Sequence, residues 1–329
     1  MNSRKIRRAA PILLVLWLFW MSAQCAVAQN RRARAAAAPK PTIANFAYGQ
    51  DSPRQKLDFW QAESDQPTPL VLMIHGGGWR GGDKSRFRRD VKQYLDADIA
   101  VAAINYRYIE QAVEQKVEPP VKACLHDAAR ALQTIRSKAK EWNLDPERVA
   151  ATGGSAGACT SLWLALHDDL AQPKSDDPIA RQSTRLTCAA VFGAQTSLDP
   201  VQVREWISNA DYGGHAFGFF GEGRGDGFKL LLANREKVLP WIREYSPIEL
   251  ATSDDPPVYL DYPNQKIAPR AGQAEKDPTH SAMYGVKLAE RLNELGVEAI
   301  VAYPQKPDSK YGSIPAFIIQ KLAEKKNRD

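Results

Sequence analysis

A serine flanked by glycines follows an apolar segment near the middle of the chain, and this feature restricts the fold more than any other. Residues 153–157 read Gly-Gly-Ser-Ala-Gly and come directly after the apolar stretch 148–152. In a G-x-S-x-G turn the glycines leave room for a sharp bend from a strand into a helix, and the bend exposes the serine hydroxyl. The pattern therefore predicts a strand, a tight turn and a helix, with Ser155 as an exposed nucleophile.

A second glycine-rich turn lies about eighty residues upstream. Residues 75–79 read His-Gly-Gly-Gly-Trp and close another apolar stretch. Backbone N–H groups in such a turn can bind the oxyanion that forms when a serine attacks a carbonyl carbon. We therefore expect the N–H groups of Gly76, Gly77 and Ala156 to form an oxyanion hole, and we expect the His75 ring to brace the loop without transferring protons.

Short apolar segments alternate with amphipathic ones from residue 57 to the end. This rhythm is typical of an α/β fold in which helices cover both faces of a mainly parallel sheet. The clearest helix is expected over 121–142, where apolar residues recur every three or four positions. The expected strands are 57–60, 70–74, 99–104, 149–152, 189–192, 258–261 and 298–302.

The N-terminal residues indicate export. Basic residues precede an apolar run at 12–21, and small residues follow at 26–28. The run is about half the length that a membrane-spanning helix needs, so we expect a cleaved signal peptide over 1–28, with an uncleaved anchor as the alternative. A basic, disordered leader is expected over 29–44 and the folded domain over 45–326. The mature protein would be secreted or periplasmic, without a membrane segment after signal cleavage.

Charge and cysteine content add little. The formal charge of +6 falls to +2 when the four basic residues of the signal are removed, so no nucleic-acid partner is expected. Cleavage would leave Cys124, Cys159 and Cys188, which permit either one disulfide or three buried thiols. The cysteine spacing matches no zinc site, and the glycines at 76–78 are too close together for a phosphate or dinucleotide loop, so no metal or cofactor is expected.

A long insert over 194–256 interrupts the alternation of strands and helices. Its segment 213–227 is dense in glycine and contains three phenylalanines. Excursions of this length in a compact α/β domain often form a lid or a binding loop. A surface loop whose aromatic residues pack locally is the alternative.

Taken together, these motifs resemble α/β-hydrolases of the carboxylesterase and hormone-sensitive-lipase-like group, of the secreted bacterial esterase type. The resemblance implies Ser155 as the nucleophile, Gly76, Gly77 and Ala156 as the oxyanion hole, and an ester substrate on a small molecule or a carbohydrate. With the interrupted rhythm, the fold expected is an α/β-hydrolase with a lid-like insert after the sixth strand. The stretches that carry it include Gln55-Lys56-Leu57-Asp58, Gly82-Asp83-Lys84, Asn105-Tyr106-Arg107 and Asp145-Pro146-Glu147-Arg148-Val149, beside the two glycine-rich turns.

The chain departs from this family at the acid and the base. The resemblance implies an acid after the seventh strand, which Asp277 fits, and a histidine after the eighth strand, where Asp308 stands instead. No histidine follows His280. The leading interpretation takes His280 as the base with Asp308 orienting it; the alternative keeps Asp277 as the acid, with His280 or His215 entering the cleft.

Two classes of function follow from the sequence. The favoured one is a serine carboxylesterase or lipase-like hydrolase, with a serine peptidase as an enzymatic rival. The other is a catalytically degenerate hydrolase that binds a ligand or a partner protein, because a serine without an imidazole in hydrogen-bond reach is a poor nucleophile at neutral pH.

Overall fold

A mixed sheet of eight strands forms the centre of the computed structural model, which describes residues 38–324. The strands lie in the order β1-β2-β4-β3-β5-β6-β7-β8. β1 and β2 run antiparallel to their neighbours, and β3 to β8 are parallel. Their bounds are β1 Ile43–Ala47, β2 Lys56–Trp60, β3 Thr68–Ile74, β4 Ala100–Ile104, β5 Leu144–Gly154, β6 Cys188–Phe192, β7 Val258–Asp261 and β8 Ala299–Ala302.

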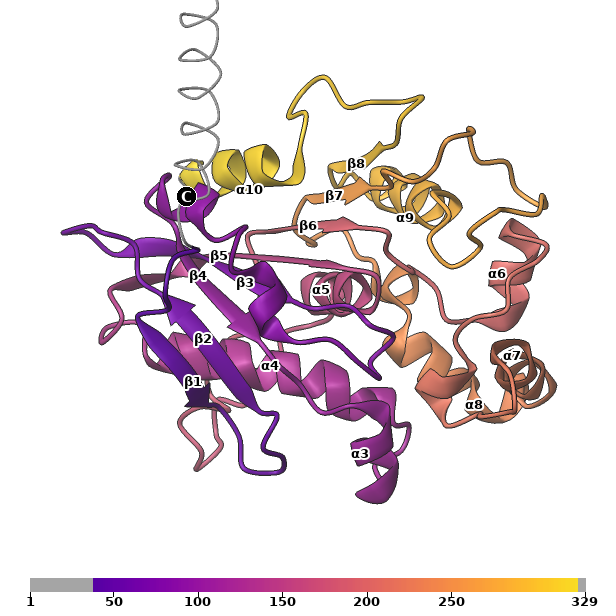
Figure 1. The fold of residues 1–329 in the computed structure, drawn as a ribbon, viewed down its shortest axis with the longest axis horizontal. Helices are drawn as coiled ribbons and strands as arrows, with labels where there is room; N and C mark the ends of the chain where they lie inside the picture. Colours follow the sequence, from indigo (N-terminus) through magenta and orange to yellow (C-terminus); the bar gives the residue numbers. More distant parts are fainter. Residues whose placement is uncertain (1–37, 325–329) are drawn as a thin grey trace, which may run out of the picture. The chain divides into compact units, whose positions relative to one another are not determined.

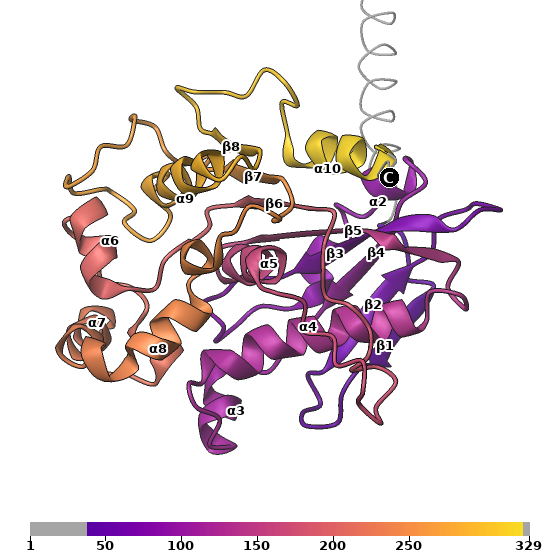
Figure 2. The same ribbon diagram turned by 180° about the vertical axis from the view of Figure 1, so that it is seen from behind.

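Helices connect the parallel strands and cover the sheet, as the sequence predicts for an α/β fold (Figures 1 and 2). The α-helices are α2 Lys92–Leu95, α3 Ile109–Glu114, α4 Val121–Ser137, α5 Ala156–Leu166, α6 Pro200–Trp206, α7 Arg224–Ala233, α8 Arg235–Tyr245, α9 Met283–Glu294 and α10 Ile314–Ala323. The 3-10 turns are η1 Lys84–Phe87, η2 Gly214–Phe217 and η3 Pro247–Leu250.

The central strands are apolar on both faces because both faces are covered. In β3, Leu70 and Leu72 pack into the layer that contains α4 and α5, whereas Val71 and Met73 pack into the layer with α2 and α10. Alternate residues of a strand point to opposite faces of the sheet, so an unbroken apolar run is required here. Because β3, β5, β6 and β7 run parallel, their carboxyl ends lie along one edge of the sheet.

The seven strands expected from the sequence all form, with ends that differ by a few residues. β1 was not expected, and it begins two residues before the predicted start of the domain. α4 ends at Ser137 instead of continuing to Trp142, whose ring turns back and stacks on Phe59 with centroids 4.6 Å apart. The predicted signal peptide and most of the predicted leader lie outside the described residues.

The insert between β6 and β7 folds into α6, η2, α7, α8 and η3. The insert is therefore long because it contains several short helices, with a glycine-rich connection between α6 and α7.

Cys124, Cys159 and Cys188 are buried free thiols, so of the two alternatives the structure shows three thiols and not one disulfide. Among residues 38–324, no helix combines the length and the apolarity needed to cross a membrane.

Candidate active site

Ser155 occupies the turn between β5 and α5 in a backbone conformation that side chains rarely adopt. Its φ and ψ are 53° and −122°, and its N–H donates to the Phe192 carbonyl at the end of β6, over 3.1 Å. Such a conformation costs of order 1–3 kcal/mol and persists only where the surroundings impose it. The bend turns the hydroxyl out of the sheet edge, as the sequence predicts.

The loop after β3 presses against this turn, which explains two of the glycines. A Cβ on Gly157 would lie 2.0 Å from the Ile74 carbonyl oxygen, and one on Gly76 would lie 2.5 Å from the Gly154 oxygen. The backbone of residues 74–76 therefore lies beside Ser155. Ala156 is the first residue of α5, where a helix leaves its N–H without an intrahelical acceptor. Of the predicted oxyanion donors, Gly76 and Ala156 thus lie next to the serine, and Gly77 follows in the same loop.

His75 holds the loop in place through its ring. Its Nδ1 lies 2.9 Å from the Gly76 carbonyl oxygen, and Nε2 lies 3.4 Å from an Arg54 guanidinium nitrogen. Because arginine only donates, Nε2 accepts and the proton sits on Nδ1, which donates to Gly76. In a trans peptide the C=O and the next N–H point in opposite directions, so this bond directs the Gly77 N–H away from the His75 ring.

The charge state of His75 agrees with this bracing role. Burial is the main cause that lowers the pKa of His75 to about 4; the hydrogen bond to Gly76 opposes this shift, and the nearby Arg54 charge adds to it. The ring is therefore neutral at pH 7 and keeps an unprotonated Nε2 for Arg54. It stacks on Tyr106 with centroids 4.3 Å apart, and the Tyr106 hydroxyl donates to the His75 carbonyl.

Replacing Arg54 by methionine is expected to lower kcat for ester hydrolysis about tenfold with little change in KM. Arg54 donates to the carbonyls of Tyr106 and Gly82 as well as to His75, so its loss frees the loop that carries the oxyanion donors. Steady-state kinetics of the purified variant would check this. Arg88→Met, at an exposed position, is the matched control. An unchanged kcat in Arg54→Met would contradict the bracing role.

His280 reaches the serine from the loop between β7 and α9. Its Nε2 lies 3.0 Å from Ser155 Oγ, and its Nδ1 lies 2.8 Å from an Asp277 carboxylate oxygen. Serine, imidazole and carboxylate thus form one hydrogen-bonded chain, the arrangement in which a histidine can take the serine proton and a carboxylate orients the histidine. The Asp277 side chain is 52% exposed and that of His280 34% exposed, so this chain is open to solvent.

A single turn brings the acid and the base together. The His280 N–H donates to the Asp277 carbonyl over 3.3 Å, which closes a four-residue turn with Pro278 at its second position. Proline is favoured there because its ring presets φ. The Asp-Pro pair that opens this turn, with Asp277 three residues before His280, is a local sequence signal, and it supports pairing Asp277 with His280.

Buried amide side chains anchor this turn to the rest of the protein. Gln195, which is fully buried, donates to the Thr279 carbonyl at 2.6 Å and to the Gly193 carbonyl at 3.2 Å. Gln265 accepts the Ala282 N–H at 3.0 Å on the far side of His280. The loop is therefore held on both sides of the imidazole. Sequence analysis missed both glutamines, because a glutamine in a loop carries no pattern that distinguishes it.

The expected pairing of His280 with Asp308 is wrong. The Asp308 carboxylate accepts the backbone N–H groups of Lys310, Tyr311 and Gly312, so it stabilises the turn that leads into α10. Burial raises the pKa of Asp308, but these three hydrogen bonds and the Lys310 charge together outweigh it and hold that pKa below its ordinary value. The aspartate after β8 thus has a local structural role.

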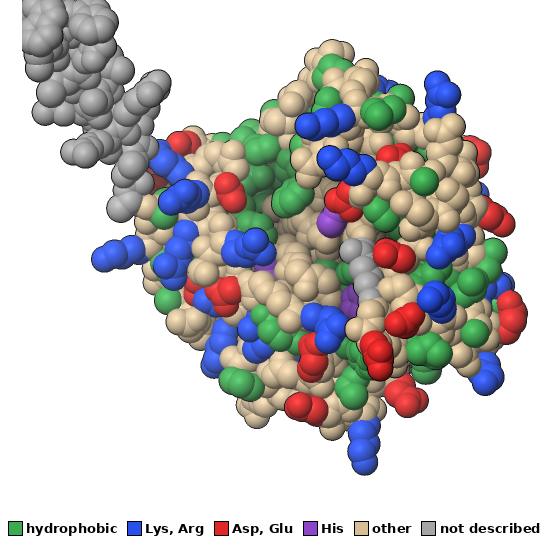
Figure 3. Space-filling view, turned by 45° about the vertical axis from the view of Figure 1, so that its right-hand side comes forward, with side chains coloured by type: hydrophobic (Ala, Val, Ile, Leu, Met, Phe, Trp, Pro, Cys, Tyr) green, Lys and Arg blue, Asp and Glu red, His purple; other side chains and the backbone are tan. Residues whose placement is uncertain are grey.

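His215, the other histidine considered as a base, lies in the insert. Its Nε2 would be 3.8 Å from a Cβ placed on Gly78, and its ring packs edge-on against Tyr212. Of the two candidates, His280 is the one that hydrogen-bonds to Ser155. Figure 3 shows a hollowed face on which histidine side chains (purple) reach the surface.

A cavity of about 370 Å³ adjoins the oxyanion loop. It lies between Gly78 and Arg80 on one side and the insert on the other, and it includes Tyr212, Phe219 and Phe220. The insert therefore builds a wall next to the oxyanion loop, consistent with a binding role for its aromatic residues. Among the described residues, no cluster of three or more His, Cys, Asp or Glu side chains is arranged to hold a metal ion.

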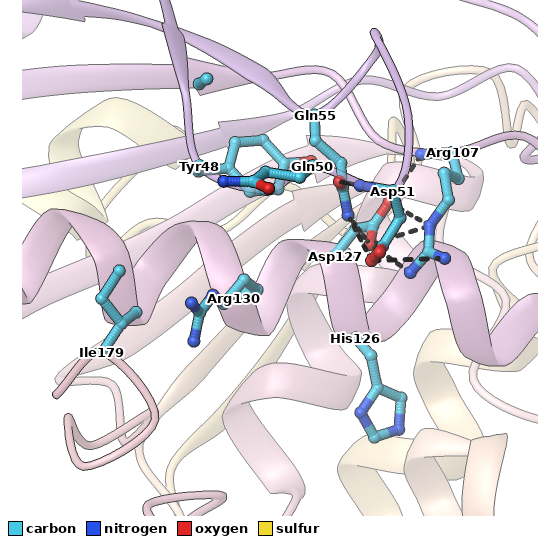
Figure 4. A pocket seen from close by; sticks show the side chains of 11 residues that line it. Tyr48, Gln50, Asp51, Gln55, Arg107, His126, Asp127, Arg130 and Ile179 are labelled. Atoms are coloured by element: carbon cyan, nitrogen blue, oxygen red, sulfur yellow. Dashed lines mark hydrogen bonds and ion pairs between the residues drawn. The ribbon is translucent and has the colours of Figure 1, made fainter. Parts of the chain in front are cut away.

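A larger cavity, of about 520 Å³, lies beside a buried carboxylate that joins three segments of the chain (Figure 4). Asp127 of α4 is buried beside it and accepts hydrogen bonds from Arg107 at 2.7 Å and from Gln55 at 2.8 Å. These bonds tie the segments after β4 and before β2 to α4. The candidate catalytic residues do not line this cavity.

A family model matches the part of the chain that holds the serine turn and the oxyanion loop. The BD-FAE model matches residues 57–265, which include Ser155 and the glycines of the oxyanion loop. The match ends before Asp277 and His280. The segment that supplies the acid and the base therefore lies beyond the part of the chain that this model describes.

Curated proteins similar to this chain are esterases by name. A probable isoprenylcysteine alpha-carbonyl methylesterase of Arabidopsis thaliana is 27% identical over 150 residues, 45% of this chain and 29% of the relative. A carboxylesterase of Mycobacterium tuberculosis is 28% identical over 154 residues, 46% of this chain and 43% of the relative. The matched stretch thus spans less than half of either relative.

Solved structures with similar folds are also described as esterases. A truncated carbohydrate esterase from gut microbiota has a TM-score of 0.64 at 18% identity, covering 88% of this chain and 99% of the other. A thermophilic esterase of Thermogutta terrifontis has a TM-score of 0.57 at 18% identity, covering 81% and 82%. At these identities the likeness establishes the α/β-hydrolase fold alone.

Proposed function

Because this chain belongs to the BD-FAE family of α/β-hydrolases, we propose that it hydrolyses carboxylic esters, with Ser155 as nucleophile, His280 as base and Asp277 as orienting acid. The observation that carries the proposal is the 3.0 Å hydrogen bond between His280 Nε2 and Ser155 Oγ. It supports an activated serine and gives no reason to favour a degenerate, ligand-binding hydrolase.

The reaction proceeds through an acyl-enzyme. Ser155 Oγ attacks the ester carbonyl carbon while His280 Nε2 takes the hydroxyl proton, and the resulting oxyanion is bound by the N–H groups of Gly76, Gly77 and Ala156. The C–O bond to the alcohol then breaks, and His280 returns the proton to the leaving oxygen. A water molecule deprotonated by His280 attacks the acyl-serine, which releases the acid and restores Ser155.

The substrate class is proposed from the resemblance and from the open site. A solvent-exposed Asp277 and His280 leave room for an ester that projects from a larger molecule, so we include esters on carbohydrates as well as small soluble esters. Export through residues 1–28 would place the enzyme outside the cytoplasm, where such esters on polysaccharides are accessible.

Labelling with a fluorophosphonate tests the proposal directly. The probe is expected to form a covalent adduct on Ser155, since it reacts with serines that an adjacent base activates. Intact-mass analysis should show the adduct in the unsubstituted protein and in Ser208→Ala, an exposed control. It should show none in Ser155→Ala. Absence of the adduct from the unsubstituted protein, with no hydrolysis of ethyl acetate, would refute the proposed function.

A further inference from the structure

Phe192 is an apolar residue left open to solvent beside the reacting groups. It ends β6, whose other residues are buried, yet it is 47% exposed. Its carbonyl accepts the Ser155 N–H, and its ring lies against Gly154, where a Cβ would come within 2.2 Å of a ring carbon. The ring thus sits directly on the turn that presents the nucleophile, with part of its surface uncovered.

The next residue connects this ring to the base. Gly193 adopts a φ of 58°, and a Cβ there would lie 3.3 Å from His280 Cδ2. Cδ2 is bonded to Nε2, the atom that returns the proton to the leaving oxygen. Gly193, the residue after Phe192, therefore lies against the Cδ2 edge of His280, next to the atom that protonates the leaving oxygen. Gly76 of the oxyanion loop also lies beside the serine, because a Cβ on Gly76 would lie 3.4 Å from Ser155 Cβ.

We propose that Phe192 is a specificity-determining residue that binds the alcohol part of the ester by stacking against a ring, such as the apolar face of a pyranoside. The inference rests on the proposed ester hydrolysis and extends it to the side of the ester that His280 protonates. A flat aromatic surface favours a flat or cyclic partner over a short linear one, because a ring covers more of its exposed area.

The test compares esters whose ring lies on one side or the other of the same bond. Cyclohexyl acetate and an acetylated methyl pyranoside carry the ring on the alcohol, and ethyl cyclohexanecarboxylate carries it on the acyl group; ethyl acetate has none. For Phe192→Ala, we expect the ratio of kcat/KM for cyclohexyl acetate to that for ethyl acetate to fall about five- to tenfold, mainly through KM.

Further variants separate stacking from a structural effect on the Ser155 turn. Phe192→Tyr keeps the ring and should keep the ratio, whereas Phe192→Leu covers Gly154 without a flat face and should lose it. Leu232→Ala, which also removes an exposed apolar side chain, is the control and should leave the ratio unchanged. The fluorophosphonate labelling rate of Ser155 reports on the turn itself.

Each outcome bears on one of the two proposals. An unchanged ratio in Phe192→Ala, or a larger loss for ethyl cyclohexanecarboxylate than for cyclohexyl acetate, would overturn the assignment of Phe192 while leaving ester hydrolysis in place. If the unsubstituted protein neither labels nor hydrolyses any of the esters, the proposed function fails and this inference fails with it.

Discussion

Replacement of His280 by alanine is expected to lower kcat for ester hydrolysis by about 10⁴- to 10⁶-fold, because Ser155 would then have no base within hydrogen-bond reach. The oxyanion donors would remain and would account for the residual rate. Hydrolysis of ethyl acetate by the purified variant, followed under single-turnover conditions, measures the loss. This result would identify His280 as the base despite its position before β8.

Two controls keep this test specific. His167→Ala, at the far end of α5 where the ring contacts Glu244, should keep kcat close to that of the unsubstituted protein. The His280 side chain is 34% exposed, so added imidazole has access to the space that the alanine leaves and should restore part of the activity. A His280→Ala variant with undiminished kcat would rule out this base.

The second large effect separates the two aspartates considered as the acid. Asp277→Asn is expected to lower kcat about 10²- to 10³-fold, because an asparagine cannot stabilise the imidazolium that forms during attack. The loss should be smaller than the roughly 10⁴-fold known for a buried acid, since the Asp277 side chain is 52% exposed and water screens its charge.

Asp308→Asn is the matched comparison. Its carboxylate accepts only backbone N–H groups of the turn before α10 among the hydrogen bonds of the described residues, so we expect an unchanged kcat and a slightly lower melting temperature. Kinetics and thermal unfolding of both variants would be measured side by side. Loss of activity in Asp308→Asn with retention in Asp277→Asn would reverse the assignment.

Much of the fold could be predicted because its signals are local. The apolar run of β3 is required by burial on both faces, and the same holds for the other central parallel strands. β1 escaped prediction because only two of its five residues are partly buried and the others are exposed, so no apolar alternation marks it. The end of α4 was misplaced because Trp142 continues the apolar spacing while packing from a turn.

At the site, the sequence predicted the residues whose roles depend on a turn of a few residues. Ser155 needs a sharp bend, and Gly153 and Gly157 are imposed by backbone atoms that lie within 2.0–2.8 Å of where a Cβ would lie. Steric exclusion of this kind leaves a readable pattern. Arg54 and Gln195 left none, because each acts by a hydrogen bond to a segment distant in the chain.

Periodic burial and steric exclusion act over a few residues, so local patterns were enough to predict the layered α/β architecture, the candidate nucleophile and the loop beside it. They did not predict the acid that pairs with His280, since the expected Asp308 lies elsewhere in the fold and Asp277 takes its place. His280 lies 125 residues from Ser155, and it reaches the hydroxyl because the order of β5, β6 and β7 places their loops side by side and Gln195 holds the loop there. Contacts between loops depend on that arrangement, which no local pattern encodes.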